Sequence, residues 1–346
     1  MNNLTAGAEI LSGQAYWLPV LFIGLMGLAF LLYAILDGYD LGVGILLPFE
    51  QTELSGKNID IATEKLRDRM IASIGPFWDA NETWLVLAVG LLLIAFPSAH
   101  SLVLGHLYLP ALVLLVGLML RGVAFDFRAK APVEHKLRWD WAFKGGSLLA
   151  TLAQGYMLGR YVGGFETGVA AHAFALLSAV CVSAGYSFIG AAWLVMKTEG
   201  ALQVRAVRWA RITLWLMVLG IAAVSIVSPL LNPEVFAKWF RLPEVILLLM
   251  IPMVVTTLVV ACDRYLANYP YRDDMGCWFP FAAAVGIFLF SFIGLGYSFF
   301  PYVVPGQLTV WQAASDISAL RFMAYGAVTV VPIILIYTAY SYRVFW

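Results

Sequence analysis

Two carboxylates three residues apart interrupt an apolar stretch near the N-terminus: Asp37 and Asp40. At this spacing they would lie on one face of a helix, one turn apart. Two acids that share a site poor in water can bind and release a proton near neutral pH. The glycines around them, Gly38, Gly42 and Gly44, favour close approach of another helix. The alternative is that the helix ends first and both acids face water.

A second acid pair with the same spacing, Asp79 and Glu82, begins another apolar stretch. Asn81 between them adds hydrogen-bonding groups, and Trp84 follows closely. The dipole of a helix alone favours acids in its first turn, and tryptophans are common anchors at membrane surfaces. Two such pairs in one chain nevertheless favour proton transfer as their shared chemistry.

A single arginine, Arg121, lies near the end of a third apolar stretch and is followed by Asp126. A guanidinium cannot shed its charge, so it must find an anion or reach water. Asp126 or an acid of the two pairs would serve, and a lipid phosphate is the alternative. Asp140, between Trp139 and Trp141, is typical of an interfacial tryptophan belt with an acid at a helix start.

The sequence predicts no metal site. The three cysteines are far apart, and only one of the four histidines, His106, would lie deep in an apolar stretch. A lone histidine in a membrane helix is more often hydrogen-bonded to a neighbour than a metal ligand, so His106 and His172 receive no role. No phosphate-binding glycine loop or catalytic triad occurs either. The chain therefore shows no self-contained redox site.

The composition indicates the environment. Of the 346 residues, 62% are hydrophobic and 12% are charged, whereas soluble domains carry roughly 25% charged residues. So little polar surface excludes a water-soluble fold. The 21 basic and 21 acidic residues cancel, which gives no indication of nucleic-acid binding. We therefore predict an all-α, polytopic integral membrane protein.

Nine stretches are apolar and long enough to cross the membrane as helices, which takes roughly 20 residues each. They are 17–40, 79–98, 102–124, 141–161, 169–196, 209–230, 245–263, 277–300 and 322–342. We expect one membrane domain, 1–346, without a separate soluble domain. The connection 51–77 is expected to hold a cytoplasmic interfacial helix that Gly75 and Pro76 end.

The basic residues predict the orientation. Connections on one side of this nine-helix bundle, with the C-terminus, hold 17 of them, and those on the other side hold four. Because basic residues gather on the cytoplasmic side, the N-terminus is expected in the periplasm and the C-terminus in the cytoplasm. Both acid pairs and Arg121 then lie near the cytoplasmic face.

Several segments resemble subunit II of the cytochrome bd-type quinol oxidases, and they follow one another in order over nearly the whole chain. They are DGYDLGVG (37–44), GPFWDANETWL (75–85), RGVAFDFRAK (121–130), WDWAFKGGSLLA (139–150), AAWLVMKTEGALQ (191–203) and VVPIILIYTAYSYRVF (330–345). Details of the fourth and fifth segments look closest to the cyanide-insensitive branch of the family.

The resemblance implies a heterodimer in the bacterial inner membrane that oxidises quinol, reduces dioxygen to water and takes protons from the cytoplasm. Subunit I of such an oxidase carries two b-type haems and haem d. Subunit II is a similar nine-helix bundle, generally without haem, that stabilises the haems and contributes a proton path at the subunit interface. A small single-helix subunit, membrane lipids and a structural quinone or lipid are further partners of the family.

The resemblance also implies roles for individual residues. Asp79 falls on the acid of the proton path, and Asp37 and Asp40 on acids linked to haem stability or proton uptake. Trp84 matches a tryptophan associated with an oxygen route in one branch. We expect Asp79, assisted by Glu82 and the first acid pair, to relay protons. Arg121 and Asp126 are expected to organise the charge network.

Two rival hypotheses remain at this point. A proton-coupled secondary transporter would use the acids for coupling, but its site would lie near mid-membrane between broken helices. The acids here gather near one face, and no matched broken segments are evident. A structural scaffold with incidental acids is the other rival. An oxidase subunit should be purified with a coloured haem-bearing partner, whereas a transporter should be colourless and alone.

Overall fold

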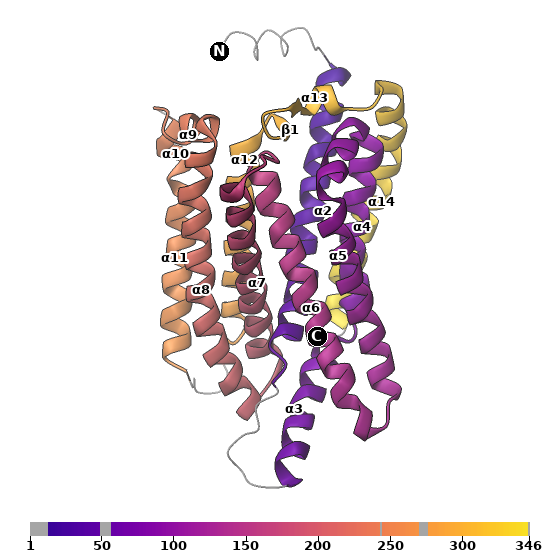
Figure 1. The fold of residues 1–346 in the computed structure, drawn as a ribbon, viewed down its shortest axis with the longest axis vertical. Helices are drawn as coiled ribbons and strands as arrows, with labels where there is room; N and C mark the ends of the chain where they lie inside the picture. The colour runs from indigo at the N-terminus through magenta and orange to yellow at the C-terminus, as the bar shows by residue number, and fades with distance from the viewer. Residues whose placement is uncertain (1–12, 49–56, 243, 270–275, 345–346) are drawn as a thin grey trace.

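The computed structural model describes residues 13–48, 57–242, 244–269 and 276–344, and these are helical almost throughout (Figure 1). The helices are α2 (Gln14–Ile45), α3 (Lys57–Ile74), α4 (Trp78–Ala95), α5 (Pro97–Lys130), α6 (Val133–Val162), α7 (Val169–Lys197), α8 (Ala201–Leu231), α9 (Pro233–Trp239), α10 (Glu244–Leu248), α11 (Met250–Ala267), α12 (Phe279–Phe299), α13 (Val310–Ala313) and α14 (Ile317–Val344). Two short antiparallel strands, β1 (Tyr302–Val304) and β2 (Leu308–Thr309), precede α13. The predicted all-α class is confirmed.

Eight helices of the described residues are long and apolar enough to cross a membrane, namely α2, α4, α5, α7, α8, α11, α12 and α14. The remaining predicted span, 141–161, lies in the 30-residue helix α6. That helix packs against both α5 and α7, and its buried polar residues Ser147, Thr151 and Arg160 lower its apolar content. The number nine and the orientation therefore stay predictions.

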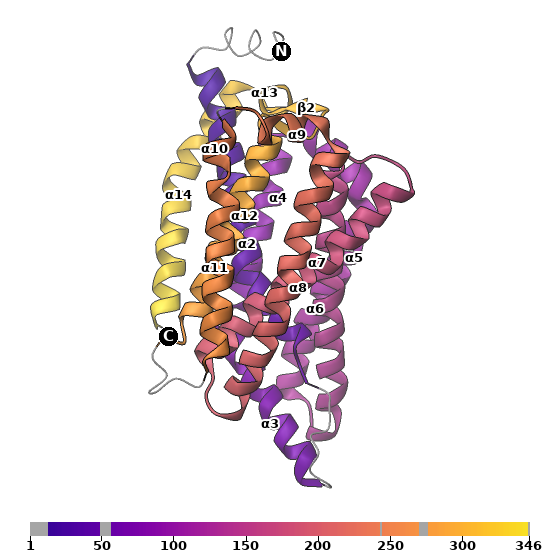
Figure 2. The same ribbon diagram turned by 90° about the vertical axis from the view of Figure 1, so that its left-hand side faces the viewer.

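The two ends of the bundle differ. The N-terminal end of α2 lies at the upper end, together with α9, α10, α13 and the two strands (Figures 1 and 2). The lower end holds α3 and the C-terminal ends of α2 and α14 (Figure 1). Both predicted acid pairs and Arg121 belong to helix segments at this lower end.

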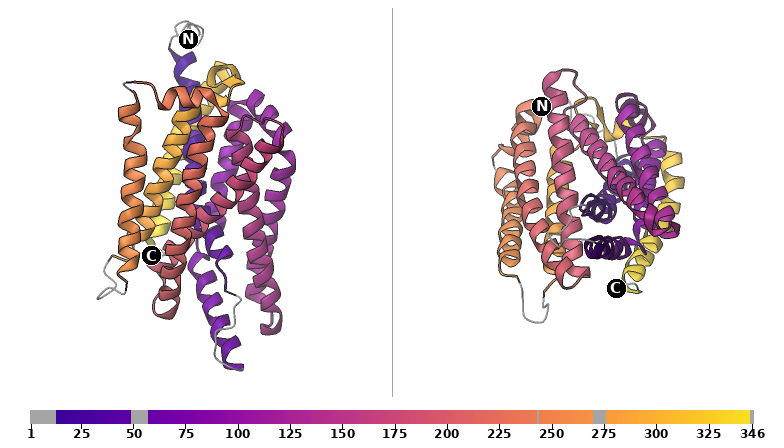
Figure 3. Two further views of the ribbon diagram at one scale, coloured as in Figure 1. Left: turned by 60° about the vertical axis from the view of Figure 1, so that its left-hand side comes forward. Right: turned by 60° about the horizontal axis from the view of Figure 1, so that its bottom comes forward.

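Helix α2 is the central element of the lower end. Seen from below, α2 and α3 lie between the magenta-to-orange helices on one side and the purple and yellow helices on the other (Figure 3, right). Helix α2 contacts α4, α6, α7, α12 and α14, and every residue from Asp37 to Gly44 is buried. It ends at Ile45, five residues beyond the predicted span 17–40.

Glycines bring α2 and α7 into backbone contact. A Cβ atom placed on Gly42 would overlap the carbonyl oxygen of Tyr186, and one placed on Gly190 would lie 2.6 Å from the carbonyl carbon of Gly42. The predicted small-residue surface of α2 is therefore used for close packing. Beside it, the rings of Tyr39 and Trp193 stack with their centroids 4.2 Å apart.

This packing predicts that Gly42→Ala destabilises the protein by about 3 kcal/mol, the upper part of the usual overpacking range. The overlap between the added methyl group and the backbone of Tyr186 could be relieved only if α2 and α7 moved apart. Gly24→Ala is the matched control, because a Cβ atom there meets nothing within 4 Å. The thermal unfolding of the purified variants measures the difference. Equal midpoints for the two variants would contradict the proposed contact.

Candidate functional site

A fully buried ion pair joins α5 to α2 at the lower end. Arg121 Nη1 lies 2.8 Å from Asp37 Oδ1, and neither side chain is exposed at all. The guanidinium carbon lies 5.8 Å from the ring centroids of Trp78 and Phe143. Asp37 is therefore the anion that Arg121 requires, and the lipid-phosphate alternative is wrong for this side chain.

The second acid of α2, Asp40, is also fully buried but has a different partner. Its Oδ2 accepts a hydrogen bond of 2.8 Å from Asn81 Nδ2 of α4. Because α2 continues past both acids, the alternative in which they face water at the end of the first span is wrong in this chain.

A ring of hydrogen bonds surrounds Asn81. The hydroxyl of Tyr342 donates to Asn81 Oδ1 over 3.0 Å, and Asn81 Nδ2 donates to the hydroxyl of Tyr39 over 3.0 Å. The two tyrosine hydroxyls are 2.7 Å apart. Sequence reasoning assigned no role to either tyrosine. The position of Tyr39 between the two acids was the one signal for it, whereas Tyr342 lies 303 residues further along the chain.

The second acid pair occupies a different environment. Asp79, in the first turn of α4, is exposed, and Glu82 is half-buried. The structure thus does not bring Asp79 into the buried cluster of Asp37, Asp40 and Arg121. Trp84 is buried, and its neighbours in the core include Ala29, Tyr33 and Ala88.

A second charge network, which sequence reasoning passed over, links α3, α5 and α6. Asp140 is fully buried; its Oδ2 lies 2.9 Å from Arg67 Nε, and its Oδ1 accepts a short hydrogen bond from Arg128. Arg128 also binds Asp68 over 2.7 Å. Asp140 is therefore a buried counter-ion inside α6 and not an acid at a helix start, whereas the interfacial tryptophan belt stays a prediction. Asp126 is exposed, and among the described residues no ion pair joins it to Arg121.

The histidines singled out in the sequence are hydrogen-bonded locally. His106 Nδ1 lies 2.9 Å from the carbonyl oxygen of Leu102 in its own helix, and its exposed ring stacks on Phe165. His172 Nδ1 lies 2.7 Å from the hydroxyl of Tyr156. Within the described ranges, no three His, Cys, Asp or Glu side chains come together as a metal-binding group.

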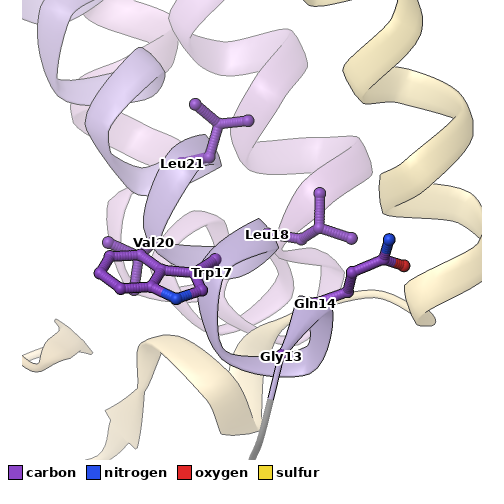
Figure 4. Close-up of a pocket in the computed structure, with 6 residues that line it drawn as sticks. All are labelled: Gly13, Gln14, Trp17, Leu18, Val20 and Leu21. Atoms are coloured by element: carbon purple, nitrogen blue, oxygen red, sulfur yellow. The ribbon is translucent and has the colours of Figure 1, made fainter.

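A shallow hollow at the N-terminal end of α2 lies away from the acids. Its lining is almost wholly apolar and consists of Gly13, Gln14, Trp17, Leu18, Val20 and Leu21 (Figure 4). No titratable side chain lines it. The hollow therefore offers no group that could transfer a proton.

Comparison with known proteins decides the family. The sequence profile described as "Cytochrome bd terminal oxidase subunit II" matches residues 18–345. The chain belongs to this family. The resemblance found in the sequence is thereby confirmed, whereas its assignment to the cyanide-insensitive branch stays a prediction.

Curated relatives of this cytochrome bd subunit II align over nearly their whole length. The "Cytochrome bd ubiquinol oxidase subunit 2" of Bacillus subtilis (strain 168) is 30% identical over 343 residues, covering 94% of this chain and 93% of that protein. The "Cytochrome bd-I ubiquinol oxidase subunit 2" of Escherichia coli (strain K12) is 29% identical over 370 residues, covering 92% of this chain and 91% of that protein.

A solved structure has the same fold. A chain of the bd oxidase from Geobacillus thermodenitrificans superposes with a TM-score of 0.75 at 16% sequence identity, covering 95% of this chain and 98% of that one. The family and the apolar helices together make this cytochrome bd subunit II a multi-pass membrane protein and one subunit of an oxidoreductase complex. A haem-bearing subunit I is the partner that such a complex implies.

The geometry around Asp140 predicts that Asp140→Asn destabilises the protein by about 3 kcal/mol, because it leaves two buried guanidinium groups without their shared counter-charge. The exposed residue Asp126 provides a matched control, and Asp126→Asn should change stability by less than about 0.5 kcal/mol. Thermal unfolding of the purified complex measures both. A small effect of Asp140→Asn would show that the network is not a stabilising element.

Proposed function

We propose that this chain is the haem-free subunit II of a quinol:oxygen oxidoreductase in the bacterial inner membrane. It stabilises the haem-bearing subunit I and contributes a proton path from the cytoplasm to the site of oxygen reduction. Subunit I would carry the two b haems and haem d, and quinol and O₂ would be the substrates of the complex. The observation that carries this proposal is the pair of fully buried carboxyl groups, Asp37 and Asp40, beside one buried guanidinium.

The energetic cost of this arrangement supports a functional role. Ionisable groups within membrane helices are expensive, and those that occur are commonly found on ion or proton pathways. Three buried polar atoms of these side chains, Asp40 Oδ1, Arg121 Nε and Arg121 Nη2, have no hydrogen-bond partner among the described residues. Buried polar atoms of this kind are typically satisfied by internal water, which is also the usual medium for proton transfer between carboxyl groups.

The positions of the acids support an order for the path. The exposed Asp79 would take up the proton at the start of α4, and the half-buried Glu82 follows one turn further along the same helix. The buried acids of α2 come next, beside Asn81 of α4. In this order the accessibility of the acids falls steadily from the surface inward.

Further roles follow from the family and remain part of the proposal. Trp84 lies among apolar neighbours in the core, which suits a route for a small apolar molecule such as O₂. A structural quinone or lipid, and a small single-helix subunit, are compatible with the exposed apolar faces of α5 and α14. The transporter hypothesis has no observation in its favour, because the acids gather at one end of the bundle and the chain belongs to an oxidase family.

The proposed path predicts that Asp79→Asn lowers the oxygen-consumption rate of the complex about tenfold or more, because Asn cannot carry a proton. The haem content should stay close to that of the unchanged protein, since the Asp79 side chain is exposed. Quinol-driven oxygen uptake and the visible spectrum of the purified complex measure the two quantities.

Glu134→Gln is the matched control for this experiment. Glu134 is also an exposed acid in the first turn of a helix, α6, but it lies outside the proposed path. Its substitution should leave oxygen uptake unchanged. An unchanged rate in Asp79→Asn would remove Asp79 from the mechanism.

A further inference from the structure

The two buried acids of α2 have unequal surroundings. Asp37 is 2.8 Å from the guanidinium of Arg121, whereas Asp40 accepts a hydrogen bond from the neutral amide of Asn81. Both carboxyl groups are fully buried. The difference between a cationic partner and a neutral partner decides which acid can stay ionised.

The charge balance of the cluster allows one carboxylate. The charged groups that act on Asp40 include Arg121, Asp37 and Glu82, and Arg121 is the cation among these three. The ion pair with Asp37 uses that positive charge. A second carboxylate at Asp40 would therefore be a buried charge without compensation, which is far more costly than a buried neutral carboxyl group.

The other groups near Asp40 do not alter this balance. Tyr39 and Tyr342 are neutral phenols at ordinary pH. The Nζ of Lys197 lies 5.4 Å from the ring of Trp193, and that ring stacks against the ring of Tyr39. Lys144 Nζ donates to the carbonyl oxygen of Leu47.

The hydrogen-bonded ring also fixes which oxygen of Asp40 can hold a proton. Tyr342 donates its hydroxyl hydrogen to Asn81 Oδ1, so the bond between the two tyrosine hydroxyls uses the hydrogen of Tyr39. The oxygen of Tyr39 in turn accepts from Asn81 Nδ2, and the same amide nitrogen donates to Asp40 Oδ2. Asp40 Oδ2 is thus an acceptor. Oδ1, which has no partner among the described residues, is the free position for a proton.

We propose that Asp40 is the neutral, proton-holding acid of this site and carries its proton on Oδ1, while Asp37 stays ionised as the counter-ion of Arg121. The inference rests on the proposed proton path and assigns its exchangeable proton to one side chain. Asn81, Tyr39 and Tyr342 act as positioning residues, because they hold Oδ2 as an acceptor and leave Oδ1 free for proton exchange.

The test is infrared spectroscopy of the intact complex, in which aspartate is labelled with ¹³C at the side-chain carboxyl. A protonated carboxyl group gives a carbonyl band separate from the carboxylate bands, and the label shifts the bands of aspartate alone. The unchanged complex should show a label-sensitive band of a protonated aspartic acid. Asp40→Asn should lose that band. The double variant D37N/R121M, from which the ion pair is removed as a whole, should keep it.

The remaining outcomes separate this inference from the proposed function. Absence of the band from the unchanged complex, its persistence in Asp40→Asn, or its loss in the double variant each overturns the assignment. Failure of Asp40→Asn to assemble with haem also overturns it, because Asn is the closest copy of a neutral carboxyl group. Loss of the band with unchanged oxygen uptake upholds the protonation state of Asp40 and rejects the proton path.

Discussion

The ion pair between Arg121 and Asp37 is the interaction on which the lower end of this bundle depends. A guanidinium cannot be neutralised by losing its proton, so its burial requires a fixed negative charge nearby. Asp37 supplies that charge from α2, and the rings of Trp78 and Phe143 approach the guanidinium from α4 and α6. One buried charge pair thus joins four helices, and it leaves Asp40 without a cation of its own.

The central position of α2 makes this arrangement possible. Its glycines let α7 approach to backbone contact at Gly42, and a Cβ atom on Gly44 would overlap the hydroxyl of Ser147 in α6. The acids are therefore enclosed by helices on several sides and reach no water at the surface. Close packing and buried charge depend on each other here, because a looser bundle would admit water and weaken the contrast between the two acids.

Much of this could be predicted from the sequence. The acid pairs, Arg121 and the glycines are polar or small residues in apolar stretches, and membrane helices carry such residues mainly where they are used. Spacing along the sequence cannot identify partners on distant helices. Several anions were therefore possible for Arg121, and nothing in the sequence indicated that Tyr342 belongs to the site. The burial of Asp140 was not predicted, because its flanking tryptophans are typical of a membrane surface and its partners Arg67 and Arg128 lie on other helices.

The most direct test of the central claim is a pair of double-mutant cycles on the purified complex, with unfolding free energy as the readout. One cycle combines Arg121→Met with Asp37→Asn, and the other combines Arg121→Met with Asp40→Asn. We expect a coupling energy of about 2 kcal/mol or more for Arg121 with Asp37, within the range measured for contacting residues, and a much smaller one for Arg121 with Asp40. Equal coupling in the two cycles, or stronger coupling to Asp40, would contradict it.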